Sequence, residues 1–119
     1  MHAQSSSATA IFNVGVGRNV TIRNVGGNCN KDDSNYSFAT TRDGERKEIS
    51  FTAKNSGRCF FEDSRSVFNI DVEGLGSIQV DFFQSFPRYI ASCPNYSRSL
   101  RLKCDYGDLE LRISRVNKG

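Results

Sequence analysis

Four cysteines, Cys29, Cys59, Cys93 and Cys104, are the residues of this 119-residue chain whose spacing points most directly to chemistry. Structural zinc sites usually take their ligands from close Cys or His pairs, and the chain contains no Cys-x-x-Cys pair. The spacing therefore favours two disulfides, for which four cysteines allow three pairings. We favour Cys29–Cys59 and Cys93–Cys104, because the second pair is nearest in sequence. Four reduced thiols in a cytosolic protein are the alternative.

General acid–base catalysis has few candidate residues. The one histidine, His2, lies in the polar first residues, so the folded part cannot offer a Ser-His or Cys-His nucleophile pair. Asp71 and Asp81 are carboxylates, which in pairs can hydrolyse glycosidic bonds, but both fall at outward strand positions without an apolar pocket to raise a pKa. We therefore expect no enzyme and no cofactor, with a small secreted hydrolase as an alternative.

Aromatic and cationic side chains in the C-terminal half are the candidates for binding a partner. In the consecutive pair Phe82-Phe83, one ring must point away from the core if the strand is regular. The predicted binding surface comprises Phe82, Phe83, Phe86, Tyr89, Tyr96, Arg98, Arg101, Lys103 and Arg112. Exposed aromatic rings can contact a membrane or a protein, and cationic groups can contact phosphate, sulfate or anionic lipid. A solvated face that also carries Asp105 and Glu110 is the alternative.

Strands of strictly alternating apolar and polar residues must position these side chains. Segment 67–82 predicts a hairpin, because its apolar residues share one face on either side of Gly74-Leu75-Gly76. Segments 100–104 and 109–113 predict a second hairpin around the turn 105–108. Segments 10–14 and 19–25 predict a third around Gly15-Val16-Gly17-Arg18. A hairpin is not stable alone, so a second sheet must pack on its apolar face.

The remaining segments complete an all-β chain. We expect strands at 35–40, 47–53 and 58–62, a loop at 26–34, and the end of a strand near Pro87. About eight to ten short strands predict an antiparallel β-sandwich or a flattened barrel with two disulfides. The expected organisation is a disordered head at 1–9, a single domain at 10–116 and a tail at 117–119.

Charge and hydropathy limit the classes of partner. The net charge of +3 permits an acidic partner without requiring one, and no nucleic-acid-binding motif occurs. No apolar run approaches the ~20 residues of a membrane span, so we expect no transmembrane segment. Two disulfides in a small all-β chain predict a secreted, extracellular protein.

Several short motifs follow one another in an order that resembles a known family. They are Ile11–Gly15, Val20–Asn24, Gly57-Arg58, Phe68–Asp71 and Gly76–Val80. This order is similar to that of the aegerolysins, small β-sandwich proteins of fungi and some bacteria, although the chain contains no tryptophan. Aegerolysins bind membrane lipids and can recruit a pore-forming partner, so the resemblance implies a lipid ligand.

In size, cysteine content and expected architecture, the chain also resembles secreted fungal effectors of the ToxA type. We therefore expect a secreted, non-enzymatic binding protein, effector or toxin-like, that acts at a host or competitor surface through a protein receptor. Binding to membrane lipid is the alternative.

Overall fold

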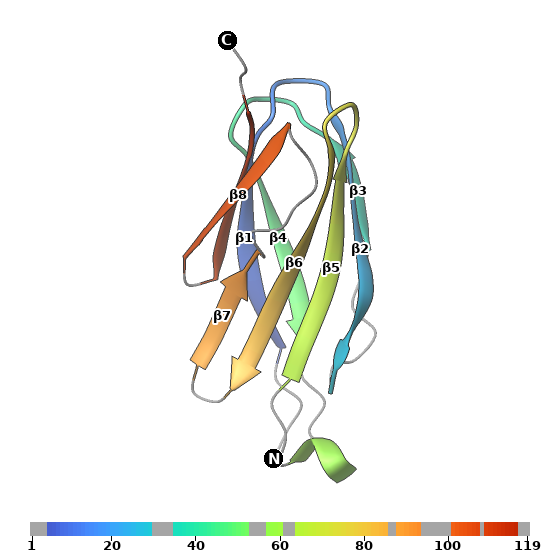
Figure 1. Ribbon diagram of the computed structural model, residues 1–119, viewed down its shortest axis with the longest axis vertical. Helices are drawn as coiled ribbons and strands as arrows, with labels where there is room; N and C mark the ends of the chain where they lie inside the picture. The colour runs from blue at the N-terminus through green and yellow to red at the C-terminus, as the bar shows by residue number, and fades with distance from the viewer. Residues whose placement is uncertain are drawn as a thin grey trace.

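The computed structural model describes residues 5–29, 35–52, 57–60, 64–85, 88–93, 101–107 and 109–116. These residues form nine strands and one short 3₁₀ helix, η1 (Figure 1). In chain order they are β1 (Ser5–Asn13), β2 (Asn19–Asn28), β3 (Tyr36–Ala39), β4 (Glu45–Thr52), η1 (Gly57–Phe60), β5 (Ser64–Val72), β6 (Gly76–Ser85), β7 (Arg88–Ser92), β8 (Leu102–Gly107) and β9 (Glu110–Arg115).

The strands form two sheets that pack face to face, as Figure 1 shows. One sheet has the order β4-β1-β9-β8 and the other has the order β3-β2-β5-β6-β7. Between them, the ring of Phe51 stacks on that of Phe82 with centroids 4.9 Å apart. The ring of Phe12 meets that of Phe38 edge-on, with centroids 5.5 Å apart. The protein is therefore a β-sandwich, and the alternative of a flattened barrel is excluded.

Alternation along the strands accounts for the core. In the β5–β6 hairpin, Phe68 lies opposite Val80 and Ile70 lies opposite Ile78, and all four side chains are buried between the sheets. Burying one such side chain contributes about 1.5–3 kcal/mol. Gly74 has a φ of 79° in the connecting turn, a conformation that glycine adopts without strain. The predicted hairpin over 67–82 is confirmed, and both strands extend beyond it.

The predicted hairpin between segments 10–14 and 19–25 is wrong, because β1 and β2 belong to different sheets. β1 pairs antiparallel with β4 and parallel with β9, so the four-stranded sheet is mixed. The alternating pattern indicates only that the apolar residues of both strands are buried in the same core. A hairpin within one sheet and a crossing between facing sheets satisfy this requirement equally well.

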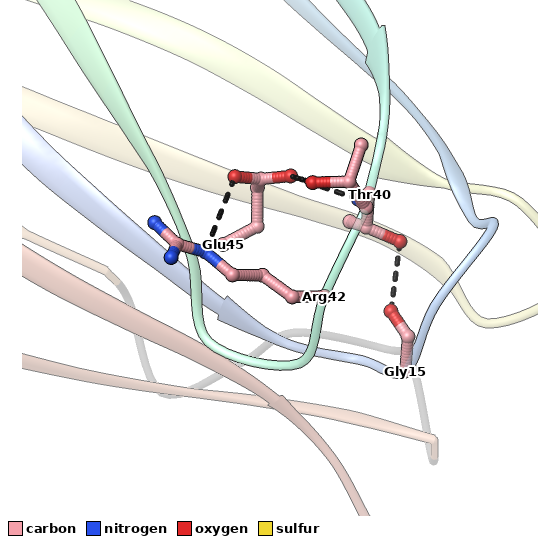
Figure 2. Close-up of polar contacts among 5 residues, drawn as sticks. Gly15, Thr40, Arg42 and Glu45 are labelled. Carbon is pink, nitrogen blue, oxygen red and sulfur yellow. Dashed lines mark hydrogen bonds and ion pairs between the residues drawn. The ribbon is translucent and has the colours of Figure 1, made fainter.

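A buried threonine holds the crossing between β1 and β2. Thr40 is 2% exposed, and its Oγ1 donates a hydrogen bond to the carbonyl of Gly15 over 2.7 Å. The same oxygen accepts a hydrogen bond from the backbone N–H of Arg18 over 2.9 Å. Figure 2 shows Thr40 facing Gly15, with the Arg42–Glu45 ion pair on the following turn. A residue of the β3–β4 connection thus fixes the link between the sheets.

Three further boundaries differ from expectation. β1 begins at Ser5, so residues 5–9 of the expected disordered head belong to a strand that pairs with β4. Where a strand was expected at 58–62, the structure has η1 over Gly57–Phe60. β7 is an additional strand that pairs with β6. Residues 1–4 of the head and the tail at 117–119 lie outside the described residues.

Both favoured disulfide pairings are confirmed. Cys29–Cys59 ties the residue after β2 to η1, and Cys93–Cys104 ties the residue after β7 to β8. Because β7 and β8 belong to different sheets, the second disulfide joins the two sheets covalently. It also fixes where the β8–β9 hairpin sits on the sandwich.

The side of the sandwich between β3 and β4 is covered by side chains. Lys47 Nζ lies 5.2 Å from the ring centroid of Tyr36 and 5.6 Å from that of Phe38. The hydroxyl of Tyr36 accepts a hydrogen bond from the backbone N–H of Ser50 over 3.0 Å, which satisfies a donor on the open edge of β4. These contacts make this side a poor place for another strand to add.

Candidate functional site

The β8–β9 hairpin presents charged side chains in a fixed register. Leu102, Leu111 and Ile113 are buried in the core, so the alternate residues of both strands face solvent. Gly107 pairs with Glu110, which leaves only residues 108 and 109 to connect the strands. We call the outward residues Lys103, Asp105, Gly107, Glu110 and Arg112 the hairpin face.

Charges of opposite sign lie next to each other on the hairpin face. Arg112 Nε lies 3.1 Å from Glu110 Oε1, and Asp105 is the residue directly opposite Arg112 in the ladder. The side chains of Arg112 and Glu110 are 61% and 41% exposed. An exposed ion pair of this kind contributes only about 0–1 kcal/mol to folding. The charges therefore remain available to a partner at little cost in stability.

A pocket of about 300 Å³ opens on this hairpin, lined by Asp105, Tyr106, Gly107, Glu110 and Arg112. Tyr106 is 55% exposed, and a Cβ added at Gly107 would meet no atom within 4 Å. The volume of the pocket is at the lower end of the ~300–1,000 Å³ that is common for ligand sites. The pocket thus brings two carboxylates and a guanidinium together on one short hairpin, whereas Tyr106, directly opposite the buried Leu111, directs its side chain to the other side of the ladder.

The structure places the residues of the predicted binding surface in different parts of the molecule. Lys103 and Arg112 lie together on the hairpin face. Arg101 is exposed just before β8, and its Nη1 donates to the carbonyl of Gly74 over 3.4 Å, so it reaches toward the β5–β6 turn. The inclusion of Phe82 is wrong, because this ring is 0% exposed in the core between the sheets.

The other aromatic candidates belong to the five-stranded sheet or are not described. Phe83 is half-buried on the outer face of that sheet, opposite Ile90 of β7. Only the backbone of Tyr89 is described, paired with Gln84. Phe86, Tyr96 and Arg98 lie outside the described residues.

Sequence reasoning did not identify Tyr106 and Gly107 as site residues. It treated Asp105 and Glu110 only as acidic residues that lower the positive charge of the surface. The reason is that segment 105–108 was taken as the turn, whereas β8 continues to Gly107. Had the alternation from Leu102 been continued, it would have aligned Asp105 with Arg112 across a two-residue connection.

Other carboxylates in the described part of the chain are engaged in local contacts. Arg65 Nη2 lies 2.5 Å from Asp81 Oδ2, and the hydroxyl of Ser77 donates to Asp71 over 3.0 Å. The backbone N–H of Thr41, then its hydroxyl, and the charge of Arg42 lower the pKa of Glu45 below its ordinary value of 4.5, against the effect of desolvation. Within the described ranges, no three metal-ligating side chains cluster, and no helix is both long and apolar enough to cross a bilayer.

No protein-family model, curated protein or solved structure matches this chain. Its function must therefore be inferred from the fold and from the hairpin face.

Proposed function

We propose that this chain is a secreted, non-enzymatic binding protein, effector or toxin-like, that attaches to a protein receptor on a host or competitor cell through the hairpin face. One observation carries the proposal: exposed charges of both signs stand in fixed register around a pocket. Complementary charges give an interface its specificity and speed its formation. A rigid hairpin also loses little conformational entropy on binding.

Secretion is supported by the two disulfides, which are compatible with an oxidising compartment. The Cys93–Cys104 bridge also bears on binding, because it anchors β8 to the opposite sheet. A hairpin anchored in this way presents Lys103 and Asp105 in one orientation.

A non-enzymatic role is supported by the contacts that the carboxylates make with neighbouring side chains. Glu110 is paired with Arg112 and Asp81 with Arg65, and Asp71 accepts a hydrogen bond from Ser77. A catalytic acid usually lies in an apolar site, whereas each of these three carboxylates contacts a polar or cationic side chain.

Binding of fluorescently labelled protein to intact microbial, plant and animal cells tests the proposal. Arg112→Glu should reduce binding at least tenfold, which corresponds to about 1.4 kcal/mol. Arg23→Glu is the matched control, because Arg23 is an exposed arginine of β2 in the other sheet and the change in net charge is the same. Mild protease treatment of the cells should abolish binding. Equal binding by the two variants would contradict the proposal.

Membrane lipid, the ligand implied by the resemblance to aegerolysins, is the second candidate. The observation that favours it is a pair of apolar residues on the outer face of the five-stranded sheet, where Phe83 lies opposite the 37%-exposed Ile90 and next to the cationic Arg65. Co-sedimentation with vesicles should then depend on lipid composition and fall for Phe83→Ser. Binding that survives protease treatment of the cells would favour this candidate over a protein receptor.

A further inference from the structure

The groups that line the hairpin pocket differ in what they can donate and accept. The carboxylates of Asp105 and Glu110 only accept hydrogen bonds, whereas the guanidinium of Arg112 only donates them. Because Arg112 pairs with Glu110 over 3.1 Å and stands opposite Asp105, donors and acceptors alternate over a short distance. A ligand that satisfies this pocket must itself carry donors and acceptors side by side.

An ionic ligand of either sign meets at least one like charge in the pocket. An anion would meet the two carboxylates, and a cation would meet Arg112 at the centre of the group. A neutral ligand avoids both repulsions and brings no charge of its own to desolvate. Hydroxyl groups on adjacent carbons fit this requirement, because each hydroxyl both donates and accepts.

Gly107 offers room for a ligand at the end of the hairpin. Gly107 has no side chain and an added Cβ there would meet no atom within 4 Å, so a ring-shaped ligand can approach the backbone closely. The pocket volume of about 300 Å³ is that of a small-molecule site.

We propose that the hairpin pocket binds a neutral sugar residue, so that the receptor is recognised through its glycan. This inference rests on the proposed function and specifies the chemistry of the same site. Asp105 and Glu110 accept hydrogen bonds from adjacent sugar hydroxyls, Arg112 donates to a sugar oxygen, and the sugar ring lies over the backbone of Gly107.

Binding of the purified protein to an array of neutral, sulfated and sialylated glycans tests the inference, followed by titration of ¹⁵N-labelled protein with the neutral monosaccharides glucose, galactose, mannose and N-acetylglucosamine. Gly107→Val should reduce sugar affinity at least tenfold, because its side chain would enter the space that is open at Gly107. Gly26→Val is the matched control, since Gly26 is an exposed strand glycine of the other sheet whose added Cβ also meets nothing.

Asp105→Asn is a second variant that preserves shape while weakening an acceptor, and it should also reduce the affinity several-fold. Amide shifts confined to β8 and β9 would support the inference. Failure to bind any neutral sugar, a preference for charged glycans, or equal affinities for Gly107→Val and Gly26→Val would overturn it.

Different experimental results would overturn the receptor proposal and the sugar inference. If Arg112→Glu abolishes cell binding while enzymatic deglycosylation of the cells and neutral sugars leave binding unchanged, the sugar inference is overturned and the receptor proposal stands. If the purified protein binds a neutral sugar but its attachment to cells resists both protease and Arg112→Glu, the receptor proposal is overturned and the pocket remains a sugar site.

Discussion

Replacing Thr40 with valine tests whether one hydroxyl holds the crossing between the two sheets. Valine has nearly the same shape but offers neither a donor nor an acceptor, so both contacts of Thr40 Oγ1 are lost. The backbone hydrogen bonds from Gly17 to Thr40, at 2.7 Å, and from Thr40 to Arg18, at 2.9 Å, are retained. The substitution therefore isolates the contribution of the hydroxyl.

The expected loss is about 2–4 kcal/mol. Two hydrogen bonds contribute roughly 1 kcal/mol each, and leaving a buried polar group without a partner costs ~1–3 kcal/mol. The carbonyl of Gly15 and the N–H of Arg18 lie in partly buried surroundings, so water recovers part of that cost. Against a total stability of ~5–15 kcal/mol, the effect is large enough to measure.

Urea unfolding followed by far-ultraviolet circular dichroism measures this change, provided the slope with denaturant stays constant. Thr40→Ser is the control, because it keeps the hydroxyl and loses one methyl group, at a cost of about 0.8 kcal/mol. The reasoning is refuted if the valine variant unfolds within about 0.5 kcal/mol of the parent, or if the serine variant loses as much as the valine variant.

Three further predictions concern the same fold. Phe82→Ala should destabilise the protein by about 3–5 kcal/mol in urea unfolding, whereas Phe83→Ala on the outer face should cost far less; similar losses would contradict the burial of Phe82. Replacing Cys93 and Cys104 together by serine should cost roughly 3 kcal/mol or more, because the bridge spans 11 residues, and calorimetry should show a clearly smaller loss if the two do not pair. Because the pKa of Glu45 is lowered on folding, its contribution to stability is complete above about 4.5 and is lost as the pH falls through the lower folded-state value. Melting temperatures measured from pH 7 to 3 should therefore fall less steeply for Glu45→Gln than for the parent protein.

Alternation along single strands was enough to predict which residues form most of the core. Phe68, Ile70, Ile78 and Val80 follow a period of two and are all buried. The same period cannot decide which sheet a strand joins, because both sheets bury their apolar residues in one interior. The position of β1 depends on Thr40 and on β9, which lie far away in sequence.

The hairpin face could be predicted only in part, for a physical reason. Lys103 and Arg112 were recognised as outward residues because their apolar neighbours alternate with them. The pocket depends on where the strands reverse, and the reversal lies between Gly107 and Glu110 rather than at Asp105. Segment 105–108 combines turn-forming residues with one large apolar residue, Tyr106, so turn propensity and strand alternation predict different registers for it.

Parallel pairing of β1 with β9 has a consequence for biosynthesis. β1 emerges from the ribosome well before its neighbour over Glu110–Ser114, because the other seven strands lie between them in the sequence. β4 can pair with one edge of β1 earlier. The other edge stays unpaired, with its amide and carbonyl groups exposed, until β9 has been synthesised. Truncated or stalled chains that lack β9 should therefore be the species that chaperones retain and that self-associate.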